Sequence, residues 1–314
     1  MASYALRRIA LAIPTLLVVL TIVFCLVRFA PGDPATAALG PDASADAIAA
    51  ARQRMGLTEP LLRQYASYLG GLAHGDLGRS LISGRPIAAD LFASLPHTIE
   101  LTLAALLIGL ATGLPLALWA AMRRNEWPDY LGRIVSLVGL SFPAFHLGIL
   151  MILLFSIKLH WLPITGAGAF DDPVDNLRHL VLPAVSLGLV GTAYVARVAR
   201  STVLKVKEED FIRAVRAKGL RPSQVTYRHT LRSALIPVTS LLGVFSITLL
   251  GSAVTTELVF ARPGIGRMLV QATLERDYNV IQSVMSVVAV MVVLVNLGTD
   301  LAYGFLDPRV RHAR

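Results

Sequence analysis

The sequence predicts an all-α membrane protein, and three features of its 314 residues indicate this fold class. Hydrophobic residues make up 55% of the chain and charged residues only 16%, with a mean hydropathy of +0.64. The apolar residues come in long runs rather than in amphipathic stripes, and a soluble protein of this composition would expose too much apolar surface. Six of these runs are long enough to cross a hydrocarbon core of about 30 Å as helices.

The six expected spans are not equally well marked. In chain order they cover residues 9–27, 101–122, 134–157, 180–196, 233–256 and 278–299. The fourth is the least secure, since it is short and contains Pro183, Gly188 and Gly191. Prolines inside membrane spans are tolerated because neighbouring helices can satisfy the carbonyl groups that a proline leaves without a partner.

The long segment 30–96 between the first two spans is predicted to hold two short helices, over residues 44–55 and 59–72. The second helix has Pro60 in its first turn and apolar residues at helical spacing. An ordered insertion of this kind could contact a substrate or an external subunit. Packing only against the other external loops is an equally good interpretation.

The distribution of Lys and Arg predicts the orientation. If the N-terminus is cytoplasmic, the inside segments carry 18 Lys and Arg residues and the short outside loops carry five. Both termini and the loop 197–232 are therefore expected in the cytoplasm. The net charge of +9 is then explained by topology and contact with anionic lipid, and no nucleic-acid motif is present.

The first apolar run is predicted to stay in the protein as a span. Arg7 and Arg8 before it are typical of a signal peptide, but the run is longer than the usual signal core and five further spans follow. The single cysteine, Cys25, lies in this run, which excludes an intrachain disulfide and a cysteine metal cluster.

The hydrophilic segment 208–237 has the pattern of a short helix followed by a turn and a second helix. Acids at its start, among them Glu209 and Asp210, suit a helix N-terminus, while Arg216 and Lys218 suit a last turn before Gly219. A helix over roughly residues 210–218 is expected. Pro222 then starts a helix that continues into the fifth span.

This short helix has the residues expected of a docking element. Ala214 and Ala217 are small enough for a partner to approach closely, and Arg213, Arg216 and Lys218 can pair with acids of that partner. The alternative is a solvated basic loop that contacts lipid headgroups. The candidate ATPase-coupling residues, whose role follows from the resemblance described below, are Glu209, Asp210, Arg213, Ala214, Arg216, Ala217, Lys218, Gly219 and Leu220.

Weaker signals lie inside the spans. Six residues are candidates for the lining of a translocation pathway: Ser141, Phe142, His146, Thr248, Ser252 and Thr255. Ordinary interhelical hydrogen bonds are at least as good an explanation for the polar ones, His146 above all. Asp300 and Glu100 fall near span ends and are interpreted as interfacial acids. Gly109 and Gly113 indicate close helix packing.

Several short motifs, in order along nearly the whole chain, carry a family resemblance. They include 30–34 (APGDP), 75–78 (GDLG), 141–143 (SFP), 161–163 (WLP), 179–183 (HLVLP), 214–237 around RAKGL and ALIP, 257–266 (ELVF with PGIG), 276–278 (RDY) and 307–309 (DPR). Together they resemble the permeases of binding-protein-dependent ABC importers, specifically the first permease of the pair in the dipeptide/oligopeptide/nickel branch. At Arg213 the broader superfamily has Glu, a change that this branch tolerates.

The resemblance implies a type I ABC importer transmembrane domain in a bacterial inner membrane. It implies a heterodimer with a second, similar permease, two cytoplasmic ATPase subunits that carry ATP and Mg²⁺, and an external substrate-binding protein. The helix 208–220 would couple ATP hydrolysis to transport. The expected parts are 1–29, the external loop 30–96, a core 97–308 with the coupling loop 200–232, and a tail 309–314.

The chain has no G-x-x-x-x-G-K-[ST] motif and no evident nucleophile-base pair or metal-ligand cluster, so a transport subunit without catalytic residues or cofactor of its own is predicted. Peptides are the expected substrate class. Nickel chelates, glutathione or another small ligand remain alternatives. A secondary transporter driven by an ion gradient is the competing class, but the chain lacks a mid-membrane acid and visible repeats. A membrane enzyme has little support.

Overall fold

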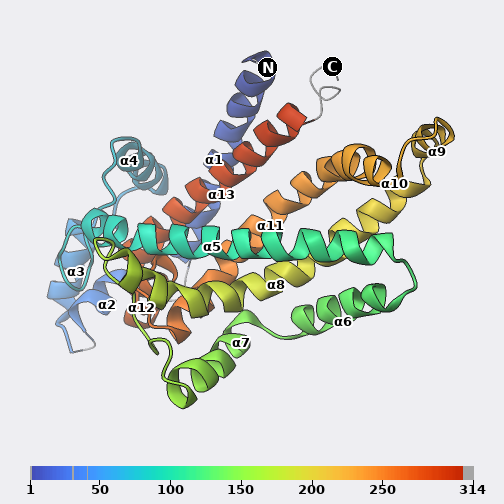
Figure 1. Ribbon diagram of the computed structural model, residues 1–314. Helices are drawn as coiled ribbons and strands as arrows, with labels where there is room; N and C mark the ends of the chain where they lie inside the picture. The colour runs from blue at the N-terminus through green and yellow to red at the C-terminus, as the bar shows by residue number, and fades with distance from the viewer. Residues whose placement is uncertain (1, 30–31, 41, 307–314) are drawn as a thin grey trace. The chain divides into compact units, whose positions relative to one another are not determined.

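The computed structural model describes residues 2–29, 32–40 and 42–306 (Figure 1). Its regular structure there is helical, apart from one bridge between Arg79 and Pro86. The helices in chain order are α1 Ala2–Phe29, α2 Pro34–Leu39, α3 Ala45–Arg54, α4 Leu61–Ala73, α5 Ile87–Met122, α6 Trp127–Ser141, α7 Ala144–Met151, the π-helical η1 Ile152–Lys158, α8 Pro173–Glu208, α9 Asp210–Ala217, α10 Pro222–Gln224, the π-helical η2 Val225–Leu231, α11 Arg232–Val259, α12 Ile265–Glu275 and α13 Tyr278–Leu306.

Among the described residues, five helices are long and apolar enough to cross a membrane, and a bent pair makes up a sixth candidate. The all-α polytopic class is confirmed, with six spans if the bent pair is one of them. The five are Tyr4–Phe29, Ile87–Met122, Pro173–Glu208, Pro237–Val259 and Tyr278–Phe305. The fourth expected span, the least secure in sequence, lies within the 36-residue helix α8, whose most apolar window is 61% buried.

The third expected span is not one straight helix. Residues 134–157 fall in α6, α7 and η1, and the axis bends by 95° between Ser141 and Ala144. Phe142 has φ −100° and ψ 127°, an extended conformation that Pro143 imposes on the residue before it. The apolar run is continuous across this point, so hydropathy alone gave no sign of the bend.

The described chain divides into two compact units. The first contains the residues up to Arg8, His97–Arg262 and those from Val295 onward, and the second contains Ile9–Pro96 and Pro263–Leu294. Each unit has its own apolar core. The motif residues Ala30 and Pro31, and 307–314 with the expected tail, lie outside the described residues.

Helix α8 is central to the first unit and packs against α6, α7 and α11 (Figure 1). Its contact with α5 depends on small residues. A Cβ atom added at Gly109 would lie 3.1 Å from the backbone of Gly191, and one at Gly113 would lie 2.9 Å from the carbonyl oxygen of Thr192. The predicted role of these two glycines in close helix packing is confirmed.

The second unit holds the insertion between the first two spans. The helix expected over 44–55 is α3, capped by Ser44, whose hydroxyl accepts from the amide of Ala47 at 3.3 Å. The helix expected over 59–72 is α4, and its Tyr65 and Tyr68 pack on Phe24 of α1 with ring centroids 5.2 and 5.7 Å away. The insertion is therefore folded onto the end of the first span.

Candidate functional site

The predicted docking helix is α9, and a sharp break separates it from α8. Glu209 adopts φ −69° and ψ 146°, which ends α8, and its carbonyl oxygen accepts from the amide of Ile212 at 3.0 Å. Asp210 occupies the first turn, where negative charge is favoured by the helix dipole. The acids that open this segment therefore mark the start of α9, as the sequence predicts.

The end of α9 depends on backbone conformation. The amide of Gly219 donates to the carbonyl of Arg216 at 2.9 Å, and Gly219 has a φ of +75°. A Cβ atom there would have no neighbour within 4 Å. Glycine is therefore favoured at this position by the left-handed backbone conformation and not by a lack of space for a side chain.

One face of α9 is buried. Ile212 is fully buried, and Val215 and Leu220 pack with it against Val206 of α8 and Val225 of η2. Leu220, one of the predicted coupling residues, thus belongs to the apolar cluster that holds α9 in place.

The opposite face of α9 is exposed and carries most of the predicted coupling residues. Those exposed are Glu209, Asp210, Arg213, Ala214, Arg216, Ala217, Lys218 and Gly219. Arg213 forms an ion pair with Asp210 at 3.3 Å, but the two side chains are 72% and 95% exposed. Such a pair contributes little in water, so both groups remain available to a partner.

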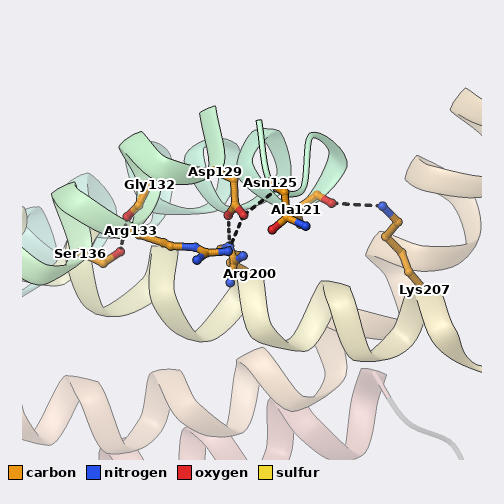
Figure 2. Close-up of polar contacts among 8 residues, drawn as sticks. All are labelled: Ala121, Asn125, Asp129, Gly132, Arg133, Ser136, Arg200 and Lys207. Carbon is orange, nitrogen blue, oxygen red and sulfur yellow. Dashed lines mark hydrogen bonds and ion pairs between the residues drawn. The ribbon is translucent and has the colours of Figure 1, made fainter. Parts of the chain in front are cut away.

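A buried ion network fixes α8 to the start of α6 (Figure 2). The carboxylate of Asp129, fully buried, accepts from Arg200 Nε, from Arg133 at 2.8 Å and from the backbone amide of Asn125 at 3.0 Å. Asn125 has a φ of +64°, which aims its amide at Asp129. A buried carboxylate is stable only when it is paired and hydrogen-bonded in this way.

Two further contacts join the end of α5 and the loop after it to the end of α8. Lys207 donates from Nζ to the carbonyl of Ala121 at 3.1 Å (Figure 2), and Arg124 pairs with Glu208 at 2.9 Å. The roles of Asp129, Arg200 and these partners were not predicted from the sequence. The only available signal was the i,i+4 spacing of Asp129 and Arg133.

A second buried network lies at the C-terminal end of α11, a helix of 28 residues whose N-terminal end follows α9, α10 and η2. Arg262 is fully buried and pairs with Glu100, which also accepts from Asn176 at 2.5 Å. Glu257, also fully buried, accepts from Thr98 at 2.5 Å. Glu100 is therefore half of a structural ion pair.

Burial and the neighbouring carboxylates act in opposite directions on the charge of Arg262. Burial lowers the pKa of its guanidinium from the ordinary value, and the neighbouring carboxylates Glu100 and Glu257 oppose that shift. Its Nη1 is buried without a hydrogen-bond partner among the described residues. Removing either carboxylate would leave a buried cation less well compensated.

The predicted pathway residues fall into two groups. Ser141, Phe142 and His146 are exposed at the bend between α6 and α7, where the rings of Phe142 and His146 stack at 5.8 Å. Thr248, Ser252 and Thr255 lie on α11, where Thr248 and Thr255 are exposed and Ser252 is half-buried. The hydroxyls of Thr248 and Thr255 each donate to a carbonyl of their own helix, which for Thr255 is that of Ser252. Across the described chain, no hydrogen bond or ring contact joins the two groups.

Asp300 is found where an interfacial acid was expected, near the end of α13. It pairs with Arg8 at 2.9 Å, and its carbonyl accepts from the hydroxyl of Tyr4 at 3.1 Å. In the described ranges, no group of three or more His, Cys, Asp and Glu side chains has an arrangement that could hold a metal ion.

These features define a polytopic helical membrane protein that presents a short, rigidly mounted basic helix at one end of its bundle. The family model for the inner membrane component of binding-protein-dependent transport systems matches residues 113–312, and the N-terminal model of the same systems matches residues 1–102. The chain belongs to this family. It is a permease subunit of an ABC importer and a multi-pass protein of the inner membrane.

Curated relatives match the chain over its full length. The dipeptide transport system permease protein DppB of Alkalihalophilus pseudofirmus is 40% identical and covers 99% of this chain and 100% of its own length. The di/tripeptide permease DppB of Pseudomonas aeruginosa is also 40% identical, with complete coverage of both chains. The glutathione permease GsiC of Salmonella typhimurium is 39% identical over 99% of this chain and 100% of its own.

The fold also matches a solved transporter. An inward-facing structure of the MetNI methionine ABC transporter superposes with a TM-score of 0.58 at 21% identity, covering 71% of this chain and 99% of that one. At this identity the match speaks for the fold alone, and it confirms the type I ABC importer transmembrane domain. The relatives are transport components, so the prediction of a transport subunit rather than an enzyme is confirmed. ATPase partners follow from the family.

Proposed function

We propose that this chain forms half of the translocation pathway of a short-peptide importer and that α9 couples it to the ATPase subunits. The observation that carries the coupling proposal is that α9 has one buried apolar face and one exposed face with small and basic residues. Ile212, 0% exposed, ties one face to α8 and η2, while the small and basic residues of the other face are open. A helix mounted in this way moves with the spans on either side of it.

The substrate class rests on the relatives. Two permeases that match over their whole lengths are named for dipeptides or di- and tripeptides, and a third is named for glutathione, itself a tripeptide. Backbone amides and charged termini are common to all these ligands. Hydroxyl groups such as Thr248 and Thr255 on the exposed face of α11 suit a pathway that accepts varied side chains.

The assembly proposed here has four further parts. They are a second, homologous permease, two ATPase subunits that bind ATP and Mg²⁺, and an external substrate-binding protein. The chain itself binds neither nucleotide nor metal. Both termini and the loop with α9 are placed in the cytoplasm, and the segment 30–96 outside, on the bias of Lys and Arg among the short loops.

The coupling role is tested by placing Ala214→Glu and Gly219→Pro together in the tagged chain. The complex is purified with its partner subunits and assayed for ATPase recovery and ATP-dependent dipeptide uptake in liposomes. We expect both to fall by about tenfold or more, because a close-packed contact gains a buried charge and loses its helix end. Retention of coupled transport would contradict the proposal.

A matched control comes from the second compact unit. Ala50 is an exposed alanine of α3, so Ala50→Glu adds the same charge to the surface of a helix other than α9. This variant should recover both ATPase subunits at the level of the unchanged chain. Loss of the ATPases in Ala50→Glu as well would indicate a general defect of folding.

A further inference from the structure

The second compact unit contains a cavity of about 460 Å³. It is lined by the end of α1, by α4 and the turns on either side of it, and by the first turns of α13. Its volume lies within the range of roughly 300 to 1,000 Å³ that small-molecule sites occupy. Nothing in the coupling mechanism uses this cavity.

Arg28 provides a cation to the cavity that has no anion of its own. It forms no ion pair or hydrogen bond with the described residues, and its Nε is buried without a partner. Its Cζ lies 5.4 Å from the ring centre of Phe24. The other arginine of the lining, Arg63, is already paired with Glu59 at 2.7 Å. A half-buried, unpaired guanidinium favours an incoming carboxylate or phosphate.

Asp76 provides the opposite charge to the same cavity. Its Oδ1 accepts from the backbone amide of Gly78 at 2.8 Å, and within the described chain its carboxylate joins no ion pair. Arg28 and Asp76 therefore line one cavity without neutralising each other. Amide and hydroxyl groups of Asn279, Gln282 and Ser283 also line the cavity, together with the polar side chains of Glu59, Gln64, Ser67 and Tyr68.

We propose that this cavity is a binding site for a zwitterion, with the anionic group of the ligand on Arg28 and its ammonium group on Asp76. Two sources have this chemistry. A short peptide carries a carboxylate and an ammonium, and a phosphatidylethanolamine headgroup carries a phosphate and an ammonium. Arg28 is half-buried and Asp76 is exposed. Charged hydrogen bonds at both ends select for molecules that carry both groups.

The peptide source is tested with the full-length chain, purified with its partner subunits in nanodiscs of phosphatidylglycerol, which has no ammonium group. Ala-Ala is titrated by calorimetry without ATP. Binding should weaken about tenfold or more in Arg28→Gln and in Asp76→Asn. N-acetyl-Ala-Ala and Ala-Ala amide, which each lack one charge, should bind the unchanged protein at least as weakly.

The lipid source is tested on the same complex in detergent. Native mass spectrometry measures retention of phosphatidylethanolamine against phosphatidylglycerol. Selective retention that is lost in Arg28→Gln and in Asp76→Asn identifies the lipid as the ligand. Arg54→Gln is the matched control, because Arg54 is exposed on α3 and lines none of the cavities at Arg28, so it should leave both ligands bound.

The outcomes separate clearly. The proposal is overturned if neither ligand depends on both charged residues. If Ala-Ala binds and its two analogues bind as tightly, the site does not recognise the two charges of a peptide, and the peptide source is excluded. Arg28→Lys guards against misfolding of the glutamine variant, since it keeps the cation and should retain part of the affinity. The peptide arm rests on the proposed substrate class, but it needs no ATP. Its failure is therefore distinguishable from failure of the coupling role.

Discussion

At the scale of single residues, two ion pairs of the first compact unit have opposite energetic roles. Asp129 is fully buried and its partner Arg200 is 19% exposed, whereas Asp210 and Arg213 are open to water. Breaking a buried pair leaves an uncompensated charge and typically costs about 3 to 5 kcal/mol, whereas an exposed pair contributes about 1 kcal/mol or less. The burial of the side chain therefore decides that Asp129 stabilises the fold and that Asp210 contributes little to it.

Asp129→Ala should consequently destabilise the protein by about 3 kcal/mol, the lower end of that range, because Arg200, 19% exposed, and the amide of Asn125 would lose their shared acceptor. Thermal unfolding of the purified chain in detergent measures this as a lower Tm. Asp210→Ala provides the comparison and should leave the Tm within about a degree, since its pair is exposed. Equal shifts for the two variants would contradict the assigned roles.

At the scale of helices, local signals in the sequence were sufficient for α9 but not for the third span. Acids at the start, cations at the end and Gly219 after them are contiguous in the chain, so the bounds of α9 could be predicted. The 95° bend after Ser141 could not, because the apolar run continues through it. Arg200 and Asp129 were also missed, since residues 71 apart meet only after folding.

The packing of α5 on α8 gives a second prediction at this scale. Gly113→Ala places a methyl group 2.9 Å from both the carbonyl of Thr192 and the Cβ of Val195, so one helix has to shift. We expect a loss of about 1 to 3 kcal/mol, typical of overpacking, measured as a lower midpoint of thermal unfolding.

Gly251 provides the control for that substitution. It lies in the middle of α11, and a Cβ atom there would have no neighbour within 4 Å. Gly251→Ala should therefore be neutral or stabilise by up to about 1 kcal/mol, through helix propensity alone. Similar destabilisation of both variants would show that the contact between α5 and α8 is looser than described.

At the scale of the whole molecule, the orientation in the membrane rests on the 18 Lys and Arg residues of the predicted inside segments against five in the short outside loops. That bias is a property of the sequence, and the contacts between helices do not show which side of the membrane each loop is on. The fold class and the bounds of α9 were predictable from the chain, whereas the two buried networks and the cavity at Arg28 depend on residues brought together by folding.

Cysteine labelling tests the orientation, since Cys25 is the only cysteine of the chain. In a Cys25→Ser background, Ala50→Cys should react with a membrane-impermeant maleimide on intact spheroplasts. Arg123→Cys should react only after the membrane is opened. Both positions are exposed. The background chain should stay unlabelled, and the reverse pattern at the two sites would place the termini outside.

The ion pair of Arg262 with Glu100 also has a consequence for biogenesis. Its two partners are separated by 162 residues, and at about 5 to 20 residues per second the ribosome needs roughly 8 to 32 seconds to make the intervening chain. Glu100 therefore reaches the translocon well before its counterion exists. The ion pair can form only after α11 has been made, so the helix bundle is completed near the end of synthesis. A chain in which this pair has not yet formed is a permease still being made.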